Sequence, residues 1–447
     1  MDLEAPGAGE VPWELLQSLR ELWRLPATSG SLASMESFKQ LVRVCNGLYG
    51  VPKGSGMELA MEYALRSLGM PALVPKDGKA VPGCLAESAR QLDEAFSSSE
   101  ALKTYLCPLD LADDVPPLQF GPAEVRTFSR KELEVLFRQP VLQRWGVGRE
   151  VDFERLRQFT WLVVREPYRP HVHPGTRAFP ILADMLIGPF GHIQPHRPKH
   201  PAILEDVLLM LLLAPWEDCG ESLPFEWRPF RIPWVYTIDD DLFVAPPPRP
   251  DAGALTWTYR TLPTEDGETL DVEVPEVLWL DQAKVGGVVS GLTDAAWRAL
   301  QQSKQSPLFT GPLRHFLTHA FSVDDIDEFL AHMLVVEAGL GLVSDFPIPK
   351  AKRPPGSAPK TAPGGKAAIH KRLVGLLGDP GAADTFDALY EERSAYLHGR
   401  EMPAGISGTS SIEARRLARR VAAALMAATG SVAPGATRES FLGQWTP

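Results

Sequence analysis

The chain is poor in cysteine, has no long apolar run and carries no excess of positive charge. Its 447 residues include four cysteines, Cys45, Cys84, Cys107 and Cys219, and no two of them have C-x-x-C spacing. Scattered cysteines of this kind argue against a disulfide framework and against a zinc site, and they are typical of a reducing compartment. We therefore expect a cytoplasmic protein with free, buried thiols.

No segment of the sequence has the length or apolar character of a membrane anchor. The longest apolar run, Val207–Ala214, is far shorter than the ~20 residues that a membrane-spanning helix needs. The opening residues, Met1–Pro6, are acidic and do not resemble a secretory signal. We therefore expect no membrane partner.

Acidic residues outnumber basic ones. The 56 Asp and Glu residues exceed the 45 Lys and Arg residues, which gives a net charge of −11. Broad, nonspecific binding to nucleic acid depends on clustered Lys and Arg, so this balance argues against it. Any contact with RNA must then be local.

The chain is too long for a single hydrophobic core, and its residue patterns change from helical periodicity to β-favouring runs and back along the sequence. We expect a multidomain α+β protein with a helical region over residues 1–100, an α+β recognition or sensor domain over 101–304, a helical bundle over 305–430 and a tail over 431–447. Helical periodicity and β-favouring runs support this division. Helices are predicted at Pro12–Trp23, Ser34–Leu48, Met57–Leu68, Leu85–Phe96, Arg130–Phe137, Pro201–Ala214 and Ser410–Ala428, and strands at Trp161–Val164, Trp234–Thr237, Leu255–Tyr259 and Val277–Leu280.

The middle region contains two groups of residues that suggest metal binding. Five histidines, His171, His173, His192, His196 and His200, lie among prolines, with no cysteine or closely set carboxylate beside them. Because a zinc site needs a complete set of ligands, we interpret them as exposed loop histidines. The run Asp239–Asp241 follows a predicted strand and is interpreted as a polar turn rather than a cation clamp. We expect no metal and no cofactor.

The strongest pattern lies in the predicted bundle. Phe386, Leu389, Tyr390, Arg393 and Leu397 recur at steps of three and four, so a helix turns Arg393 onto its apolar face. A guanidinium keeps its charge, and a buried one needs an anion. Gly399 is predicted to end this helix.

Glu337 is the candidate anion, because it interrupts the apolar stripe of the helix that contains Ile326, Leu330, Met333 and Leu340. We expect a contact between Glu337 and Arg393, which either directs the guanidinium toward a ligand or is a structural ion pair. His398 follows five residues after Arg393, about 140° further round an ideal helix. The two side chains meet only if the helix ends near Gly399, or if a symmetry mate completes the site.

Arg393, Ser394, His398 and Gly399 resemble the R-x4-6-H motif of HEPN domains, in particular the Apea-like HEPN group. Arg314–Phe316 is similar to the arginine-aromatic element of the first HEPN helix, and Asp325–Ala338 is similar to the second helix with its glutamate. The resemblance covers roughly residues 301–430. Arg314 and His319 show the same spacing by chance. Many nuclease members have Asn, Asp or His where this chain has Ser394.

The resemblance implies a metal-independent endoribonuclease of bacterial stress response or antiphage defence that works as a homodimer on RNA. His398 would be the general base or acid and Arg393 the phosphate clamp, because imidazole titrates near neutrality and guanidinium donates a fork of hydrogen bonds. Ser394 and Tyr396 would be supporting donors, and Glu337 would orient Arg393. The alternative is a noncatalytic binding or dimerisation module, in which Glu337 holds Arg393 as structure and His398 caps the helix.

Two basic stretches are candidates for RNA contact. Residues 345–365 are rich in Pro, Gly and Lys and, with Lys366, Lys371 and Arg372 beyond them, form either a guide for RNA or a solvated linker. Arg415 and Arg419 on the last predicted helix, together with Arg400, form either a phosphate-binding ridge or an ordinary surface.

Overall fold

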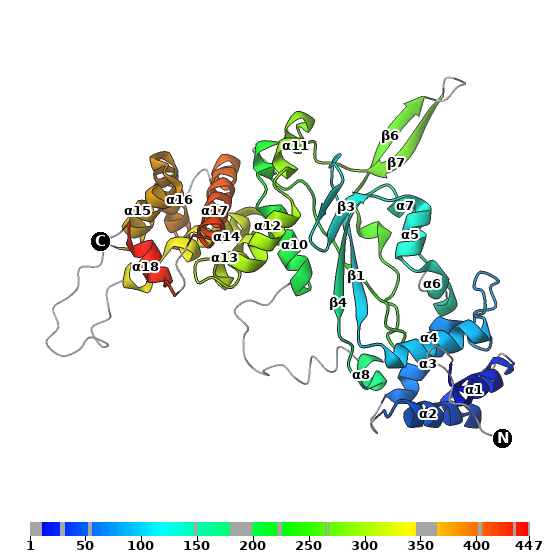
Figure 1. Cartoon of the computed structure of the whole chain (residues 1–447). Helices are drawn as coiled ribbons and strands as arrows, with labels where there is room; N and C mark the ends of the chain where they lie inside the picture. The colour runs from blue at the N-terminus through cyan, green and yellow to red at the C-terminus, as the bar shows by residue number, and fades with distance from the viewer. Residues whose placement is uncertain are drawn as a thin grey trace. The chain divides into compact units, whose positions relative to one another are not determined.

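The computed structural model describes residues 11–26, 32–51, 56–146, 150–178, 199–220, 226–263, 266, 268–345, 364–400, 405–431 and 435–445 (Figure 1). They form two compact units, each built from separate parts of the chain. Unit 1 comprises Met1–Pro108, Thr127–Ile193 and Ile232–Pro275, and unit 2 comprises Leu109–Arg126, Gln194–Arg231 and Glu276–Pro447. The domain limits inferred above from helical periodicity and β-favouring runs stay a prediction.

Unit 1 begins with four amphipathic helices, whose limits agree with the predicted ones to within two residues. These are α1 (Trp13–Trp23), α2 (Glu36–Leu48), α3 (Met57–Leu68) and α4 (Leu85–Ser97). Their apolar faces form one core, in which residues such as Phe38, Leu41 and Met61 are fully buried. Gly69 ends α3 in the left-handed conformation, with φ of 79°, where a side chain would be strained.

The rest of unit 1 contains β-strands with short helices beside them. Strands β4, β1 and β5 are neighbours in that order, and β1 pairs with β5 in a register that places Lys103 opposite Asp239. A second core gathers around Trp161 of β4 and Phe137, whose ring centroids lie 5.7 Å apart. The elements are β1 (Ala101–Leu109), α5 (Arg130–Leu136), α6 (Gln139–Trp145), α7 (Phe153–Leu156), β4 (Thr160–Tyr168), α8 (Pro174–Ala178), β5 (Tyr236–Asp239) and the hairpin β6 (Trp257–Pro263) with β7 (Thr269–Pro275).

Unit 2 is mainly a helical assembly in which α13, α14, α16 and α17 pack together (Figure 1). Gly339 of α14 allows close approach, because a Cβ there would lie 3.1 Å from side-chain atoms of Leu313, Val421 and Leu425. The elements are β2 (Leu118–Phe120), β3 (Ala123–Thr127), α10 (Ala202–Leu212), α11 (Gln282–Val289), α12 (Asp294–Ser303), α13 (Gly311–Phe321), α14 (Asp325–Leu340), α15 (Gly365–Leu377), α16 (Pro380–Leu397), α17 (Gly408–Ala428) and α18 (Arg438–Gly443). The chain thus combines helices with small sheets, as the α+β prediction requires.

Two local predictions were wrong. Val277–Leu280 is not a strand, because only Val277 and Leu280 find partners, in isolated bridges to Leu111 and Gly220. The segment predicted as a tail contains α18, whose Leu442 is fully buried. Arg438 fixes this helix by donating hydrogen bonds to the carbonyls of Ala338 and Gly339, at 2.6 and 2.7 Å.

The cysteines and histidines also differ in part from expectation. The four thiols are free, but Cys84 is exposed, since it stands just before the first turn of α4. His173 and His200 are buried rather than exposed, and burial lowers the pKa of His200 to about 4. His192 and His196 lie outside the described residues. Within the described ranges, no three His, Cys, Asp or Glu side chains gather closely enough to bind a metal ion.

No helix in the described part of the chain combines the length and the apolar character needed to cross a membrane.

Candidate functional site

Helix α16 places Arg393 close to its C-terminal end. Its first turn is fixed by Pro380 and by Asp379, whose side chain accepts a hydrogen bond from the Ala382 N–H. The helix ends where Gly399 adopts a φ of 63°. The Gly399 and Arg400 N–H groups donate to the carbonyls of Tyr396 and Ala395, which is the Schellman arrangement. The predicted helix stop at Gly399 is therefore confirmed.

Arg393 pairs with Glu337 of the neighbouring helix α14. Arg393 Nε lies 3.3 Å from Glu337 Oε1, and the two side chains are 20% and 24% exposed. Burial raises the pKa of Glu337, and the nearby guanidinium partly offsets this effect. The predicted contact is confirmed, and among the described residues it is the one ion pair of Arg393. Its Cζ also lies 5.7 Å from the centre of the Tyr390 ring.

The other motif residues lie at the exposed end of α16. His398 is the C-cap residue and is exposed, and its N–H donates to the Ser394 carbonyl at 3.1 Å. Tyr396 is 46% exposed, Ser394 is half-buried and Arg400 is exposed. Within the described residues, Arg393 and His398 make no side-chain contact. In one chain, the Arg393 guanidinium therefore lies between α14 and α16, and the His398 imidazole lies at the C-terminal end of α16.

A cavity of about 630 Å³ lies beside the motif residue Tyr396. Its wall includes Trp227, Glu328 and Ile412, and it contains the carboxyl groups of Asp325 and Glu328 but no Lys, Arg or His among the described residues. An RNA phosphate is repelled by such a lining, so this cavity is a poor phosphate site. The sequence analysis did not identify it.

Glu328 is the centre of a buried polar network. Its carboxylate accepts hydrogen bonds from Trp227 Nε1 at 2.8 Å and from Arg228 Nη2 at 2.6 Å. His332, one turn later on α14, is fully buried against the Trp227 ring, and burial lowers its pKa well below 6.5. Glu328 and His332 are four residues apart, so the sequence predicts that they lie on the same side of the helix. Their partners, about 100 residues away in sequence, carry no such signal.

The pKa of Glu328 predicts how the stability of unit 2 depends on pH. Burial raises this pKa from 4.5 to about 7, so the folded state retains a proton that the unfolded chain releases. The contribution of Glu328 to the free energy of unfolding should therefore fall as pH rises from about 4.5 to about 7, by ~3 kcal/mol. Because the lowered pKa values of His200 and His332 contribute with the opposite sign below pH 6.5, the quantity to measure is the free energy of unfolding of the wild type minus that of Glu328→Gln, by urea unfolding at several pH values. This difference should fall over the window, whereas the difference between the wild type and the exposed-residue variant Asp327→Asn should not, and a constant difference for Glu328→Gln contradicts the assignment.

Arg415 and Arg419 do not form a surface ridge. The prediction that Arg415 lies on the surface was wrong, because its side chain is fully buried and its Nε lies 3.4 Å from Glu217 Oε2. Arg419 is 14% exposed and donates to Glu217 Oε1 at 2.6 Å. Of the three predicted RNA contacts, only Arg400 lies on an exposed surface.

The other basic stretch is also partly structural. Residues 346–363 lie outside the described part of the chain. Asp345, predicted to begin a solvated linker, is buried together with Arg372, and Lys366 lies 2.7 Å from Glu391. Arg372 is therefore not available as a phosphate contact, whereas Lys366 belongs to a partly exposed ion pair.

The Glu337–Arg393 pair should show a measurable coupling energy. We expect the double-mutant cycle of Glu337→Ala and Arg393→Ala to give ~0.5–1 kcal/mol, because the pair is only partly screened by solvent. The four proteins would be compared by urea unfolding. Strictly additive losses would show that the two residues do not interact.

The chain matches no family model, and comparison with curated proteins and with solved structures reveals no similar protein. The resemblance to HEPN domains therefore rests on the residues of α14 and α16 themselves.

Proposed function

We propose that this chain is a metal-independent endoribonuclease of HEPN type that acts in bacterial stress response or antiphage defence. The observation that carries the proposal is the way in which Arg393 is held. Glu337 Oε1 lies 3.3 Å from its Nε, in an ion pair without a hydrogen bond, and among the described residues no acceptor takes the two terminal nitrogens. A guanidinium fixed in this way can present those nitrogens as a fork to a phosphate.

The reaction needs one base, one acid and a cation. His398 would accept the proton of a ribose 2′-hydroxyl, and the 2′-oxygen would attack the adjacent phosphorus. Arg393 would stabilise the negative charge that develops on the phosphoryl oxygens. As the bond to the 5′-oxygen breaks, that oxygen must receive a proton, so the products are a 2′,3′-cyclic phosphate and a 5′-hydroxyl.

A homodimer would supply the acid. Arg393 and His398 lie on different parts of the α16 surface, and one chain offers a single His398. A second copy related by two-fold symmetry would bring a second imidazole to a shared groove, so that one acts as base and the other as acid. Sedimentation of the intact chain tests this arrangement, and a strict monomer would remove it.

RNA cleavage by purified wild type and His398→Ala is the direct test of the nuclease function. Loss of a general base should slow cleavage by about 10²–10⁴-fold, with little effect on melting because His398 is exposed. His319→Ala is the matched control, since His319 is also exposed and follows Arg314 at the same spacing. Induced expression in a bacterial host, with total RNA on a gel, extends the test to growth.

A second candidate is a noncatalytic binding or dimerisation module. The observation in its favour is that the Arg393 side chain is only 20% exposed and already has an anionic partner. In that case wild type and His398→Ala would be equally inactive and equally well folded. Cleavage that survives in His398→Ala would exclude His398 as the catalytic base.

A further inference from the structure

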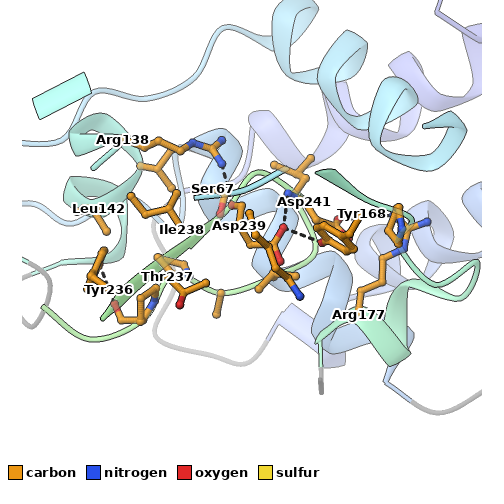
Figure 2. Close-up of a pocket in the computed structure, with 18 of the residues that line it drawn as sticks. Ser67, Arg138, Leu142, Tyr168, Arg177, Tyr236, Thr237, Ile238, Asp239 and Asp241 are labelled. Atoms are coloured by element: carbon orange, nitrogen blue, oxygen red, sulfur yellow. Dashed lines mark hydrogen bonds and ion pairs between the residues drawn. The ribbon is translucent and has the colours of Figure 1, made fainter. Parts of the chain in front are cut away.

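Unit 1 contains a cavity that is separate from the HEPN-like motif. Its volume is about 710 Å³, within the usual range of small-molecule sites. The wall is formed by the end of β4, by β5 and the loop that follows it, and by α6 (Figure 2). Each of these elements belongs to unit 1, so the cavity exists within a single compact body.

Most of the cavity wall is apolar. Phe137, Leu142 and Tyr236 are buried, and the rings of Phe137 and Tyr236 lie with centroids 5.0 Å apart. Pro246 and Pro247 add flat apolar surface. Such walls fit an aromatic or similarly flat body, since aromatic side chains provide broad and rigid contact faces.

The polar part of the wall carries more positive than negative charge. The lining residues that are charged at neutral pH are Lys103, Arg138, Arg169, Arg177, Asp239 and Asp241. Four of them are basic and two are acidic, which leaves an excess of two positive charges. This excess is local, because the whole chain has a net charge of −11. The cavity therefore favours an anion although the protein as a whole repels one.

Both carboxylates of the wall are already engaged by residues of unit 1. Asp239 Oδ1 accepts hydrogen bonds from the Tyr168 hydroxyl at 2.7 Å and from the Asp241 N–H at 3.0 Å (Figure 2). Asp241 Oδ1 accepts from the Phe243 N–H at 3.1 Å and lies 3.6 Å from Arg177 Nη1. The predicted polar turn is therefore present, and its carboxylates interact with groups that the protein itself supplies.

Arg138 has no carboxylate partner of this kind. Its Nη1 donates to the Asp239 carbonyl at 3.0 Å, and it forms no ion pair with any described residue. Its Nε and Nη2 keep accessible surface and have no acceptor among the described residues. Burial lowers the pKa of Arg138, and Asp240 and Asp239 partly offset this effect. A half-buried guanidinium keeps its charge, so its position favours a ligand that supplies an anion.

The backbone at Arg138 is strained. Its φ is 53°, in the left-handed region that residues with a Cβ rarely adopt. This conformation joins α5 to α6 at the point where Arg138 lines the cavity. Residues held in such conformations are frequent at ligand-binding sites, where the surrounding structure imposes the strain. The strain at Arg138 is therefore an observation independent of the charges that also marks this part of the wall.

We infer that this cavity binds a small anion with a flat apolar body, whose carboxylate or phosphate accepts hydrogen bonds from Arg138. The planar guanidinium matches both head groups, because its nitrogens form a fork of donors. Arg169, which is exposed and also lines the cavity, adds a second positive charge. Binding at unit 1 is a property distinct from the proposed RNA cleavage by unit 2, and the inference does not depend on nuclease activity.

Calorimetric titration of the full chain with four naphthalene probes tests the inference. The probes are 2-naphthoate, 2-naphthyl phosphate, the uncharged 2-naphthamide and the cationic 2-naphthylmethylammonium. At least one anion should bind about tenfold more tightly than the amide, as expected for hydrogen bonds between charged groups, and the cation should bind most weakly. The tighter anion identifies the head group. An amide or a cation that binds as tightly as both anions, or no binding of either anion, would overturn the proposal.

Variants show whether Arg138 supplies the contact. Arg138→Asn removes the guanidinium and tolerates the left-handed backbone, so it should weaken anion binding about tenfold, with a smaller effect on the amide. The matched control Arg165→Gln removes an exposed positive charge of β4 that does not line the cavity, and it should bind the probes as the wild type does. Unchanged anion binding in a folded Arg138→Asn protein contradicts the assigned site.

Arg169→Gln gives a second test if Arg138→Asn folds poorly. Because Arg169 is exposed, its replacement should leave the fold intact. Loss of this partly screened charge should weaken anion binding about two- to threefold and leave binding of the amide unchanged. Anion binding as tight as that of the wild type in Arg169→Gln would show that the positive charges of the wall do not hold the ligand.

Discussion

Replacing Asp345 with alanine should lower the free energy of unfolding of unit 2 by about 3–5 kcal/mol. Asp345 receives two parallel hydrogen bonds from Arg372, at 2.6 and 2.8 Å, and both side chains are 2% exposed. Arg372 also donates to the Leu340 carbonyl at 2.8 Å and to the Leu442 carbonyl at 3.3 Å. The substitution leaves a buried guanidinium without its anion, which is the costly half of a broken buried pair. Urea unfolding followed by circular dichroism measures the loss.

The Lys366–Glu391 pair provides the control. It joins α15 and α16, but its side chains are 33% and 62% exposed. Solvent screens such a pair, so Glu391→Ala should cost much less stability than Asp345→Ala. A loss from Asp345→Ala no larger than that from Glu391→Ala would show that the buried pair does not stabilise the bundle.

Features with a short sequence range could be predicted. The spacing of apolar residues and a following glycine define α3, and the observed limits Met57–Leu68 are those predicted. The stop of α16 at Gly399 depends on the same kind of local signal. These elements form because each residue's preference agrees with that of its neighbours three and four positions away.

Contacts between distant segments could not be predicted in the same way. Arg372 and Arg415 both appeared to be surface charges, yet each is buried against an acid from another part of the chain. The partner of Arg415 is Glu217, about 200 residues earlier, and no periodicity connects the two. Arginine on a helix is usually exposed, so only the folded structure shows which ones are not.

The candidate site falls between these cases. Glu337 and Arg393 could be paired from sequence because each interrupts an apolar stripe, and a buried charge requires a partner. The position of His398 relative to Arg393 depends on how α16 ends and on what lies across from it. Asp241 was predicted to lie in a turn, but its place at the end of a cavity follows from the packing of β5 against distant residues.

Replacing Glu217 with alanine should lower the free energy of unfolding of unit 2 by about 3–5 kcal/mol. Glu217 is fully buried, and it pairs with two arginines, with Oε1 2.6 Å from Arg419 Nε and Oε2 3.4 Å from Arg415 Nε. Arg415 is also fully buried, with its Cζ 4.2 Å from the centre of the Trp227 ring. Without Glu217, the guanidinium of Arg415, which cannot reach water, would keep only uncharged partners, the Trp227 ring and the carbonyls of Leu212 and Ala214. Equilibrium urea unfolding of the variant gives the value.

Arg415→Met should cost less than Glu217→Ala, because Glu217 would keep its shorter contact to Arg419. The double variant Glu217→Leu with Arg415→Met should recover part of the loss caused by Glu217→Ala, since it removes both fully buried charges, while Arg419, which is 14% exposed, still loses its anion. The same proteins decide the role of Arg415. If Arg415→Met weakens RNA binding without changing stability, Arg415 contacts RNA as the sequence suggested. If the loss appears in stability and the double variant restores it, Arg415 holds α17 against the segment that carries Glu217.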